Sequence, residues 1–506
     1  MKISILKRGI ILLASAFLAF GTTSCKWLDI QPADTMGEND LFSKGDGYRT
    51  ALNGIYLKLS STSLYARGRS YGMTEALAHT HEWNSAYKNN LDYKDVASYT
   101  YTTNGVKSII SGIWSTAYNA IANCNNILDK IGNEPAGKFK GGEAERNLIQ
   151  GEALAIRAFC HYLILVYFAP TPDLYKPDEE GKLPVALPYY DKFSKDIADY
   201  LEIPAFIDRI IADYIAAQEL VAGYDLADNL NQYRLTTKYR FSGKTYSSAY
   251  PQTDDIFFAF RGYRMNYYAI TALLARVYNY AGNHEEAARA ARIVIDATSP
   301  GGKLFTFTST EDAQADYKLS SDLIFGVSKS TLIDDYNRFR STGTTLQLNT
   351  MYSMLISSST SDYRWSTLVK KNTAGNNVCA RYTTPSMSGD LTTATQDIIP
   401  VIRLSEMYYI LAEKAADDAL WDRAADYIET VQVGRSAPEN QLAGKIGNTE
   451  TFRSELLNDV RLEFVEEGQI FLYCKKLNVA PNAWDTSDSF RETWWYFPMP
   501  ENETIF

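Results

Sequence analysis

Apolar side chains recur at three- and four-residue steps through much of the chain, and this spacing is typical of amphipathic helices. The stretches that carry it are residues 41–59, 109–131, 145–167, 204–222, 264–280, 285–295 and 404–433. Five prolines between positions 170 and 188 keep that segment out of helix, because proline lacks a backbone donor and fixes φ. Residues 323–327 form one short strand-like run. The pattern predicts a mainly α protein with little strand.

Two of these helices form a recognisable pair. Gly282 lies between residues 264–280 and 285–295 in what reads as a turn, alanines stand where the paired helices would approach, and aromatic residues would face the partner. This arrangement resembles one tetratricopeptide repeat. Residues 404–433 repeat it, and residues 109–167 supply a third, more divergent pair. Because a regular period of about 34 residues is not maintained, we expect a partial solenoid of helix pairs, interrupted by long loops.

Two stretches between the helices have a different character. Residues 60–104 are polar and rich in aromatic side chains, and residues 298–398 are dominated by Ser, Thr, Asn, Asp and Tyr. We expect both to be long and irregular. Loops of this length inside a compact protein usually carry function, so these stretches are the first place to look for a binding site.

Charge and cysteine content exclude several classes of protein. The first 24 of the 506 residues hold three bases and no acids, so the rest of the chain has 47 bases against 60 acids. A nucleic-acid-binding protein would rarely be this acidic, and we expect no nucleic-acid partner. The five cysteines are scattered without a CxxC pair, and there are only four histidines. A zinc cluster or a disulfide framework is therefore not expected.

The N-terminus reads as a targeting segment. Basic residues near the start are followed by an apolar run over residues 9–20, by small residues, and then by Cys25. The apolar run is too short for a comfortable membrane-spanning helix. The pattern resembles a bacterial lipobox, which makes residues 1–24 a signal peptide and Cys25 a diacylated N-terminal residue carrying palmitate-like chains. The alternative is an ordinary secretory signal followed by a structural cysteine. We find no further spanning stretch, so we expect a soluble body on a lipid tether.

Short motifs from Cys25 to the C-terminus together resemble the SusD/RagB family of nutrient-binding outer-membrane lipoproteins of Bacteroidetes. Each motif is modest alone, but their order and spacing are specific. They are Cys25-x-x-Leu28-Asp29-x-x-Pro32, Ala51-Leu52-Asn53-Gly54-Ile55-Tyr56, Gly151-Glu152-Ala153, Arg157-Ala158-Phe159, Ile399-Pro400-Val401-Ile402-Arg403-Leu404, residues 461–468, and Phe497-Pro498-Met499-Pro500.

This resemblance implies an organisation and a function. Residues 25–225 would form a SusD-like N-terminal region, and residues 260–506 a RagB/SusD-like C-terminal region packed with it as one body. The protein would not be an enzyme and would need no cofactor. It would capture a glycan and hand it to a SusC-like TonB-dependent outer-membrane transporter, while anchored by lipid in the outer membrane and facing the exterior. The RagB-like alternative is capture of peptides with the same transporter.

Candidate ligand-binding residues come from the two polar stretches. Sugar rings stack their C–H faces on aromatic planes, and their hydroxyls bond to polar side chains. The candidates are Trp83, Tyr87, Tyr93, Tyr336, Arg338, Arg340 and Trp365. The alternative is that these aromatics fill small cores beneath the loops. Trp83 and Trp365 are the strongest candidates, because an indole in a polar loop needs either a local core or a ligand.

Catalytic and metal sites are weakly indicated. Arg403, Glu406 and Glu413 share one predicted helix, and we expect them to build a buried charge network with residues 461–467. A catalytic carboxylate pair is the alternative, although no histidine stands nearby in sequence. His79 and His81 are two residues apart with no third ligand in sight, so we expect no metal. A lipid-anchored glycosidase and a purely structural scaffold remain the competing functions.

Overall fold

The structure is a computed structural model, and it describes residues 37–177, 181, 183, 185–243, 251, 253–341, 345–356, 361–481 and 490–501. The predicted signal peptide and the predicted lipidation site Cys25 lie outside these residues.

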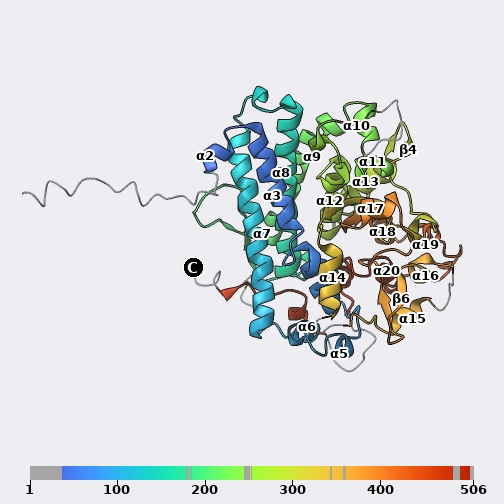
Figure 1. The fold of residues 1–506 in the computed structure, drawn as a ribbon. Coiled ribbons are helices and arrows are strands. Elements are labelled where there is room, and N and C mark those ends of the chain that lie inside the picture. Colours follow the sequence, from blue (N-terminus) through green and yellow to red (C-terminus); the bar gives the residue numbers. More distant parts are fainter. Residues whose placement is uncertain are drawn as a thin grey trace, which may run out of the picture.

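Long helices form the body of the protein, and the apolar spacing predicts those between residues 45 and 434 but not the two at 449–463 and 470–477. They are α3 (Gly45–Leu59), α7 (Asn104–Ile131), α8 (Gly142–Phe168), α9 (Ile203–Asp225), α12 (Tyr267–Tyr280), α13 (His284–Ile295), α18 (Leu404–Asp417), α19 (Trp421–Gly434), α20 (Thr449–Glu463) and α21 (Ile470–Leu477). In Figure 1 the long helices α3, α7 and α8 run alongside one another on one side of the molecule, and the helices of the C-terminal half lie on the other side.

Helix pairs stack in the order of the chain. Helix α7 packs on α8, α8 on α9, α9 on α12, α12 on α13, α13 on α18, and α18 on α19. Ala275 of α12 and Ala287 of α13 are fully buried where the backbones approach, and Gly282 adopts φ +76° in the connecting turn. A side chain would strain that turn. The predicted partial solenoid of tetratricopeptide-like pairs is thereby confirmed.

Helix α8 is the core helix of this stack. By length and composition alone it qualifies as a membrane span, but 94% of its most apolar window is buried inside the protein. Glu145 and Glu152 on α8 are fully buried as well, together with most of its aliphatic residues. Surrounding helices, and not lipid, therefore cover its apolar surface.

Strands are short and paired. Among the described residues they form four antiparallel two-stranded sheets: β1 (Ala186–Pro188) with β2 (Tyr200–Glu202), β3 (Thr298–Ser299) with β4 (Gly302–Lys303), β5 (Leu323–Ser328) with β8 (Ile398–Arg403), and β6 (Val369–Lys371) with β7 (Asn377–Cys379). The expected strand at 323–327 is β5. Its partner β8 was not predicted, because Pro400 within it argues against a strand and is tolerated here in a sheet of only two strands.

The two polar stretches are more ordered than expected. The first holds the π-helix η2 (Tyr65–Tyr71), α4 (Met73–Leu77), α5 (Trp83–Ala86) and α6 (Leu91–Ala97), and the second holds α14 (Leu332–Ser341), α15 (Met351–Ile356), α16 (Tyr363–Ser366) and α17 (Asp390–Thr395). Such short helices are not detected by periodicity, which needs a window of 11 to 18 residues. Helices α5 and α6 lie at the lower end of the molecule in Figure 1, and α15 lies at its lower right.

Short elements complete the fold. They are α2 (Glu38–Leu41), η3 (Ala136–Lys138), η4 (Pro172–Leu174), α10 (Asn229–Tyr233), α11 (Thr237–Arg240), η5 (Ile256–Phe258), η6 (Arg261–Tyr263), η7 (Asp312–Gln314) and η8 (Glu492–Trp494). The C-terminal residues 497–500 contain no helix, as their prolines predict, and the backbone N–H of Phe497 donates to the carbonyl of Tyr167 over 2.7 Å.

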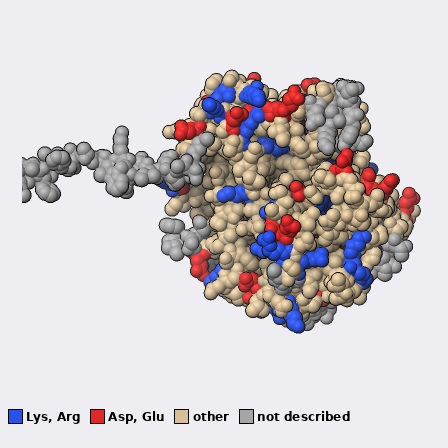
Figure 2. Space-filling model, viewed as in Figure 1, with Lys and Arg blue, Asp and Glu red and all other residues tan. Residues whose placement is uncertain are grey.

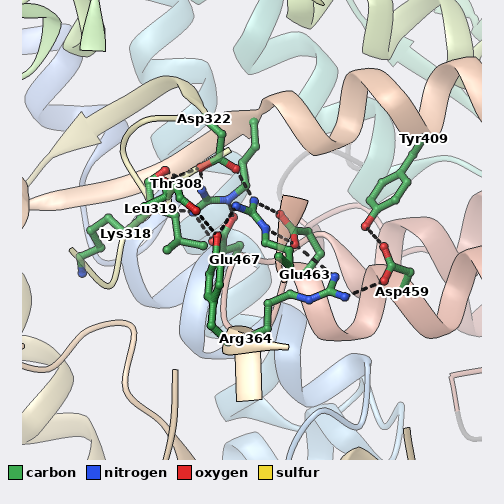
Figure 3. Close-up of polar contacts among 12 residues, drawn as sticks. Thr308, Lys318, Leu319, Asp322, Arg364, Tyr409, Asp459, Glu463 and Glu467 are labelled. Atoms are coloured by element: carbon green, nitrogen blue, oxygen red, sulfur yellow. Dashed lines mark hydrogen bonds and ion pairs between the residues drawn. The ribbon is translucent and has the colours of Figure 1, made fainter. Parts of the chain in front are cut away.

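A buried charge network joins β5, β8 and the C-terminal helices (Figure 3). Arg403 pairs with Glu467 over 2.5 Å, as predicted. Glu406 and Glu413 differ from the prediction, because they face α12 and α21: Glu406 pairs with Arg276 over 2.6 Å, and Glu413 with Lys476 over 2.6 Å. All three carboxylates are buried and ion-paired, which is the structural role and not that of a catalytic pair.

Candidate functional site

The three predicted tyrosines lie inside the core. Tyr87 and Tyr336 have no exposed surface and Tyr93 is 6% exposed. The Tyr336 hydroxyl donates to Glu466 over 3.0 Å, and the Tyr87 hydroxyl lies 2.9 Å from Nδ1 of His81. Their ring faces pack on protein side chains and are closed to a sugar. For these three positions the structure corrects the binding prediction and supports the alternative of satellite cores.

The two polar stretches do converge in space. His81 and Leu348 form an antiparallel bridge, and the N–H of Glu82 donates to the carbonyl of Gln347 over 2.9 Å. Trp83 is half-buried beside His79, with ring centroids 6.1 Å apart. Residues far apart in the sequence therefore share one surface, to which the first stretch contributes a partly exposed indole.

Trp365 and the two arginines lie on the second stretch. Trp365 is half-buried and packs on the small core that contains Leu348. The side chain of Arg338 is 74% exposed, and its guanidinium lies 3.8 Å from Asp335. Arg340 lies over the ring of Tyr336, with 5.8 Å between the guanidinium carbon and the centroid. Trp83, Trp365, Arg338 and Arg340 thus keep surface that a ligand can reach, and their binding role stays a prediction.

A large open cleft lies elsewhere, and sequence analysis did not predict it. Its volume is about 1030 Å³. Five parts of the described chain line it: one face of α3, residues 241–242, residues 256–264, residues 328–331 at the end of β5, and residues 390–397 around α17. A cleft of this size accommodates a ligand of several sugar units, since small-molecule pockets span about 300–1000 Å³.

The aromatic wall of the cleft is held by a buried arginine. Residues 256–264 make two 3-10 turns, η5 and η6, which leave Phe260 and Tyr263 half-buried at the cleft. Arg261 lies between them and donates to Glu152 over 2.8 Å and to Asp225 over 3.0 Å. Because these ion pairs are fully buried, they fix the loop firmly against α8 and α9.

Two glycines allow the aromatic rings to pack closely. A Cβ on Gly262 would lie 2.6 Å from the ring of Phe241, and a Cβ on Gly243 would lie 2.6 Å from the ring of Phe260. Phe260 itself has φ +53°, an unusual conformation for an aromatic residue. The ring positions at this wall therefore depend on residues that carry no side chain, and the wall is preformed.

Helix α3 supplies an adjoining wall, in direct contact with the aromatic loop. Arg49, Asn53, Tyr56 and Leu57 recur at helical spacing and line the cleft. The Tyr56 hydroxyl donates to Glu152 over 2.7 Å, so the same buried carboxylate that holds the aromatic loop also holds this wall. The sequence analysis placed Tyr56 within the predicted helix at residues 41–59. Its only signal at this position was the motif at 51–56.

Charges at the cleft are largely compensated. Arg49 pairs with Glu145 over 2.5 Å and with Asp255 over 2.8 Å. Burial opposes ionisation of Asp255, but its hydrogen bonds with Arg49 outweigh burial and lower the pKa of that carboxyl. Burial raises the pKa of Asp397 on the far side. Figure 2 shows acidic and basic groups interspersed over the visible face, with no large patch of one sign.

A second chamber of about 470 Å³ adjoins the cleft. The two share Phe241, Ser242, Asp390 and Ala394 in their linings, so they form one continuous groove. We call the two chambers together the groove. Within the part of the chain that the structure describes, no group of three or more His, Cys, Asp or Glu side chains is arranged to hold a metal ion.

The fold is that of a helical-repeat protein with an open, preformed groove. Comparison with known proteins shows a similar family and similar structures. The SusD-like_3 family, described as "Starch-binding associating with outer membrane", matches residues 26–242. No curated protein sequence matches the chain.

Solved structures share the fold over nearly the whole chain. A SusD superfamily protein from Bacteroides thetaiotaomicron is 20% identical with a TM-score of 0.61, covering 91% of this chain and 97% of its own. A putative sugar-binding protein from Bacteroides vulgatus is 19% identical with a TM-score of 0.63, covering 91% and 96%. A laminarin-binding SusD-like protein is 14% identical with a TM-score of 0.61, covering 91% and 97%. Residues 26–242 are thus similar to the SusD-like family, and the chain shares the fold of these solved structures; both findings support the resemblance found in its motifs.

Proposed function

We propose that this protein captures a glycan in the groove and passes it to a SusC-like TonB-dependent transporter of the outer membrane. The observation that carries the proposal is the open cleft of about 1030 Å³, which combines partly exposed aromatic rings with hydrogen-bonding side chains. Tyr56, Phe260 and Tyr263 offer rings for the C–H faces of sugars, and Asn53 and the residues at 328–331 offer polar groups for hydroxyls.

The family supports a sugar ligand. The matched family is described as starch-binding, and two of the similar structures are described as a putative sugar-binding protein and a laminarin-binding protein. Each description belongs to that relative. For this chain the ring-and-polar lining of the groove supports a sugar ligand, and no catalytic step is part of the proposal.

The location and organisation follow from the N-terminal pattern. We propose that residues 1–24 are removed, that Cys25 carries the lipid anchor, and that the body faces the exterior of the outer membrane. Residues 25–225 and 260–506 form one packed body in this proposal. The packing of α9 on α12, with smaller contacts of α3 with β5 and of α8 with α12, supports that organisation.

Calorimetric titration of the purified full-length protein in detergent against a panel of plant, host and microbial polysaccharides tests the function. Leu57 and Leu91 provide a matched pair, because their side chains are 70% and 69% exposed but only Leu57 lines the groove. We expect Tyr263→Ala to weaken binding about ten-fold or more, Leu57→Asp to weaken it as well, and Leu91→Asp to leave it unchanged.

The same titrations locate the site. If Trp83→Ala and Trp365→Ala abolish binding while Tyr263→Ala does not, the glycan binds at the converged polar stretches and not in the groove. If no polysaccharide binds but peptides do, the RagB-like alternative is correct and the glycan proposal is wrong. Pull-down of a TonB-dependent barrel from the native outer membrane tests the transporter partnership separately.

A further inference from the structure

The basic side chains that line the groove are all engaged. Arg49 is held by Glu145 and Asp255, and Arg264 lies 2.8 Å from Glu152. Lys329, at the end of β5, lies 3.2 Å from Asp335. These pairs are mostly buried, with side-chain exposures of 14%, 12% and 19% for the three bases. Among the described residues, each base of the lining thus already has an acidic partner, with which an anionic ligand would have to compete.

Three acidic side chains that line the groove, in contrast, have no basic partner among the described residues. Asp390 and Asp397 line the cleft, and Asp312 and Asp390 line the second chamber. Asp312 and Asp390 are exposed. Within the described residues, none of these three carboxylates forms an ion pair. The exposed carboxylates of Asp312 and Asp390 therefore leave the described lining of the groove with unpaired negative charge.

The second chamber shows the same excess of acidic over basic side chains among its described residues. Its described lining contains no basic side chain, and it is rich in hydroxyls, from Thr237, Ser242, Thr306, Ser320, Ser321 and Thr395. Arg240 lies beneath it, but is only 1% exposed and donates to the carbonyls of Leu304, Ser320 and Ser321 over 2.7 to 3.0 Å. These neutral acceptors use its donors, so the guanidinium does not reach into the chamber.

We infer that the groove selects neutral or amine-bearing oligosaccharides and rejects glycans that carry carboxylates or sulfates. This inference rests on the proposed function and names its substrate class. Hydroxyl and carboxylate linings bond to the hydroxyls and ammonium groups of a ligand. A uronate or sulfate would lie close to unpaired carboxylates without a free base, and like charges placed together oppose binding.

The test compares two forms of one polymer. The polysaccharide with the highest affinity in the panel is titrated as it is, and after oxidation of its primary alcohols to carboxylates, at low ionic strength. We expect the oxidised form to bind about ten-fold more weakly, or worse. The difference should shrink at high salt, because the charges at the groove are partly exposed and screened.

Charge reversal separates repulsion from the loss of a hydroxyl contact. Asp312→Lys combined with Asp390→Lys should restore affinity for the oxidised polymer about five-fold or more, because it replaces two repulsive charges with attractive ones. Asp208→Lys, an exposed position on α9 outside the groove, is the matched control and should restore nothing.

The outcomes distinguish the inference from the function. If the oxidised polymer binds as tightly as the neutral one, or if the double reversal restores no affinity, the inference is overturned and glycan capture stands. If the strongest ligand of the panel is itself a uronate or a sulfated glycan, the inference is likewise overturned. Absence of binding by every polysaccharide overturns the proposed function and the inference together.

Discussion

Replacing Arg435 tests how much the buried charge network contributes to stability. Its guanidinium is fully buried and bonds to both carboxylate oxygens of Glu463, to one oxygen of Asp322, and to the hydroxyl of Tyr363. Arg435→Met leaves two buried carboxylates without their main partner. Breaking a buried pair costs about 3–5 kcal/mol, and because two anions are affected here we expect a loss near the upper end, about 4–5 kcal/mol.

The loss of stability in Arg435→Met should depend on pH. Burial alone would raise the pKa of Glu463, but the guanidinium of Arg435 and its hydrogen bonds lower it well below 4.5. A folded-state pKa below the unfolded one contributes stability that is present above pH 4.5 and lost as pH falls through the folded value. Without Arg435, the pKa of Glu463 should be higher, so a proton can neutralise the buried carboxylate. The penalty of the substitution should therefore be largest near pH 7 and smaller near pH 5.

Urea denaturation followed by circular dichroism measures the effect. With a denaturant slope of about 3 kcal/mol/M, a loss of about 4 kcal/mol lowers the midpoint by about 1.3 M. Arg289→Met is the matched control, because Arg289 pairs with Glu286 at the surface with 62% of its side chain exposed. Such pairs contribute at most about 1 kcal/mol. Equal shifts for the two variants, or a penalty that does not depend on pH, would refute the reasoning.

Three further predictions concern buried positions. Gly468→Ala should destabilise the protein by about 2 kcal/mol or more, because φ is +69° and the new Cβ would lie 2.1 Å from the carbonyl oxygen of Arg69. Gly375→Ala is the control: its φ is +81° but its Cβ would meet open space, so it should cost only about 1 kcal/mol in the same urea titrations. Burial raises the pKa of Glu75 from 4.5 to about 8, so the folded protein keeps a proton that the unfolded chain loses. Stability should fall as pH rises from about 4.5 to 8, and urea midpoints across this range should show that Glu75→Gln removes that slope. Burial lowers the pKa of Lys475 from 10.5 to about 7, so its contribution to stability should rise between pH 7 and about 10, and Lys475→Met should flatten the midpoints measured there.

Sequence periodicity predicted the helical body well. The long helices bury a continuous apolar stripe, so the spacing of apolar residues indicates both the helix and its buried face. A buried charge network between Arg403 and the segment at 461–467 was predicted too, although Arg403 ends β8 and does not lie on the helix with Glu406 and Glu413 as expected. The order of stacking from α7 to α19 followed from the helix pairs, since consecutive pairs in a repeat protein pack on their neighbours.

The candidate site was harder to predict, because partners far away in the chain decide whether a side chain is buried or faces the solvent. Tyr336 and Tyr87 read as ligand-binding rings in polar stretches, yet they are buried against Glu466 and His81, and Glu466 lies 130 residues from Tyr336 and 385 from His81. The groove depends likewise on the pairing of Arg261 with Asp225, 36 residues away, and with Glu152, 109 residues away. No local pattern records which of these partners a side chain will meet.

The rigidity of the groove follows from the position of two glutamates on the core helix. Glu145 and Glu152 are seven residues apart on α8, so they lie on the same face of that helix. Glu145 pairs with Arg49 of α3. Glu152 pairs with Arg264 of the aromatic loop and also accepts a hydrogen bond from the Tyr56 hydroxyl of α3. Both carboxylates are fully buried. Because α8 is also the helix on which α7 and α9 pack, the helical body and the groove share one support, and a ligand meets walls whose spacing is set before it binds.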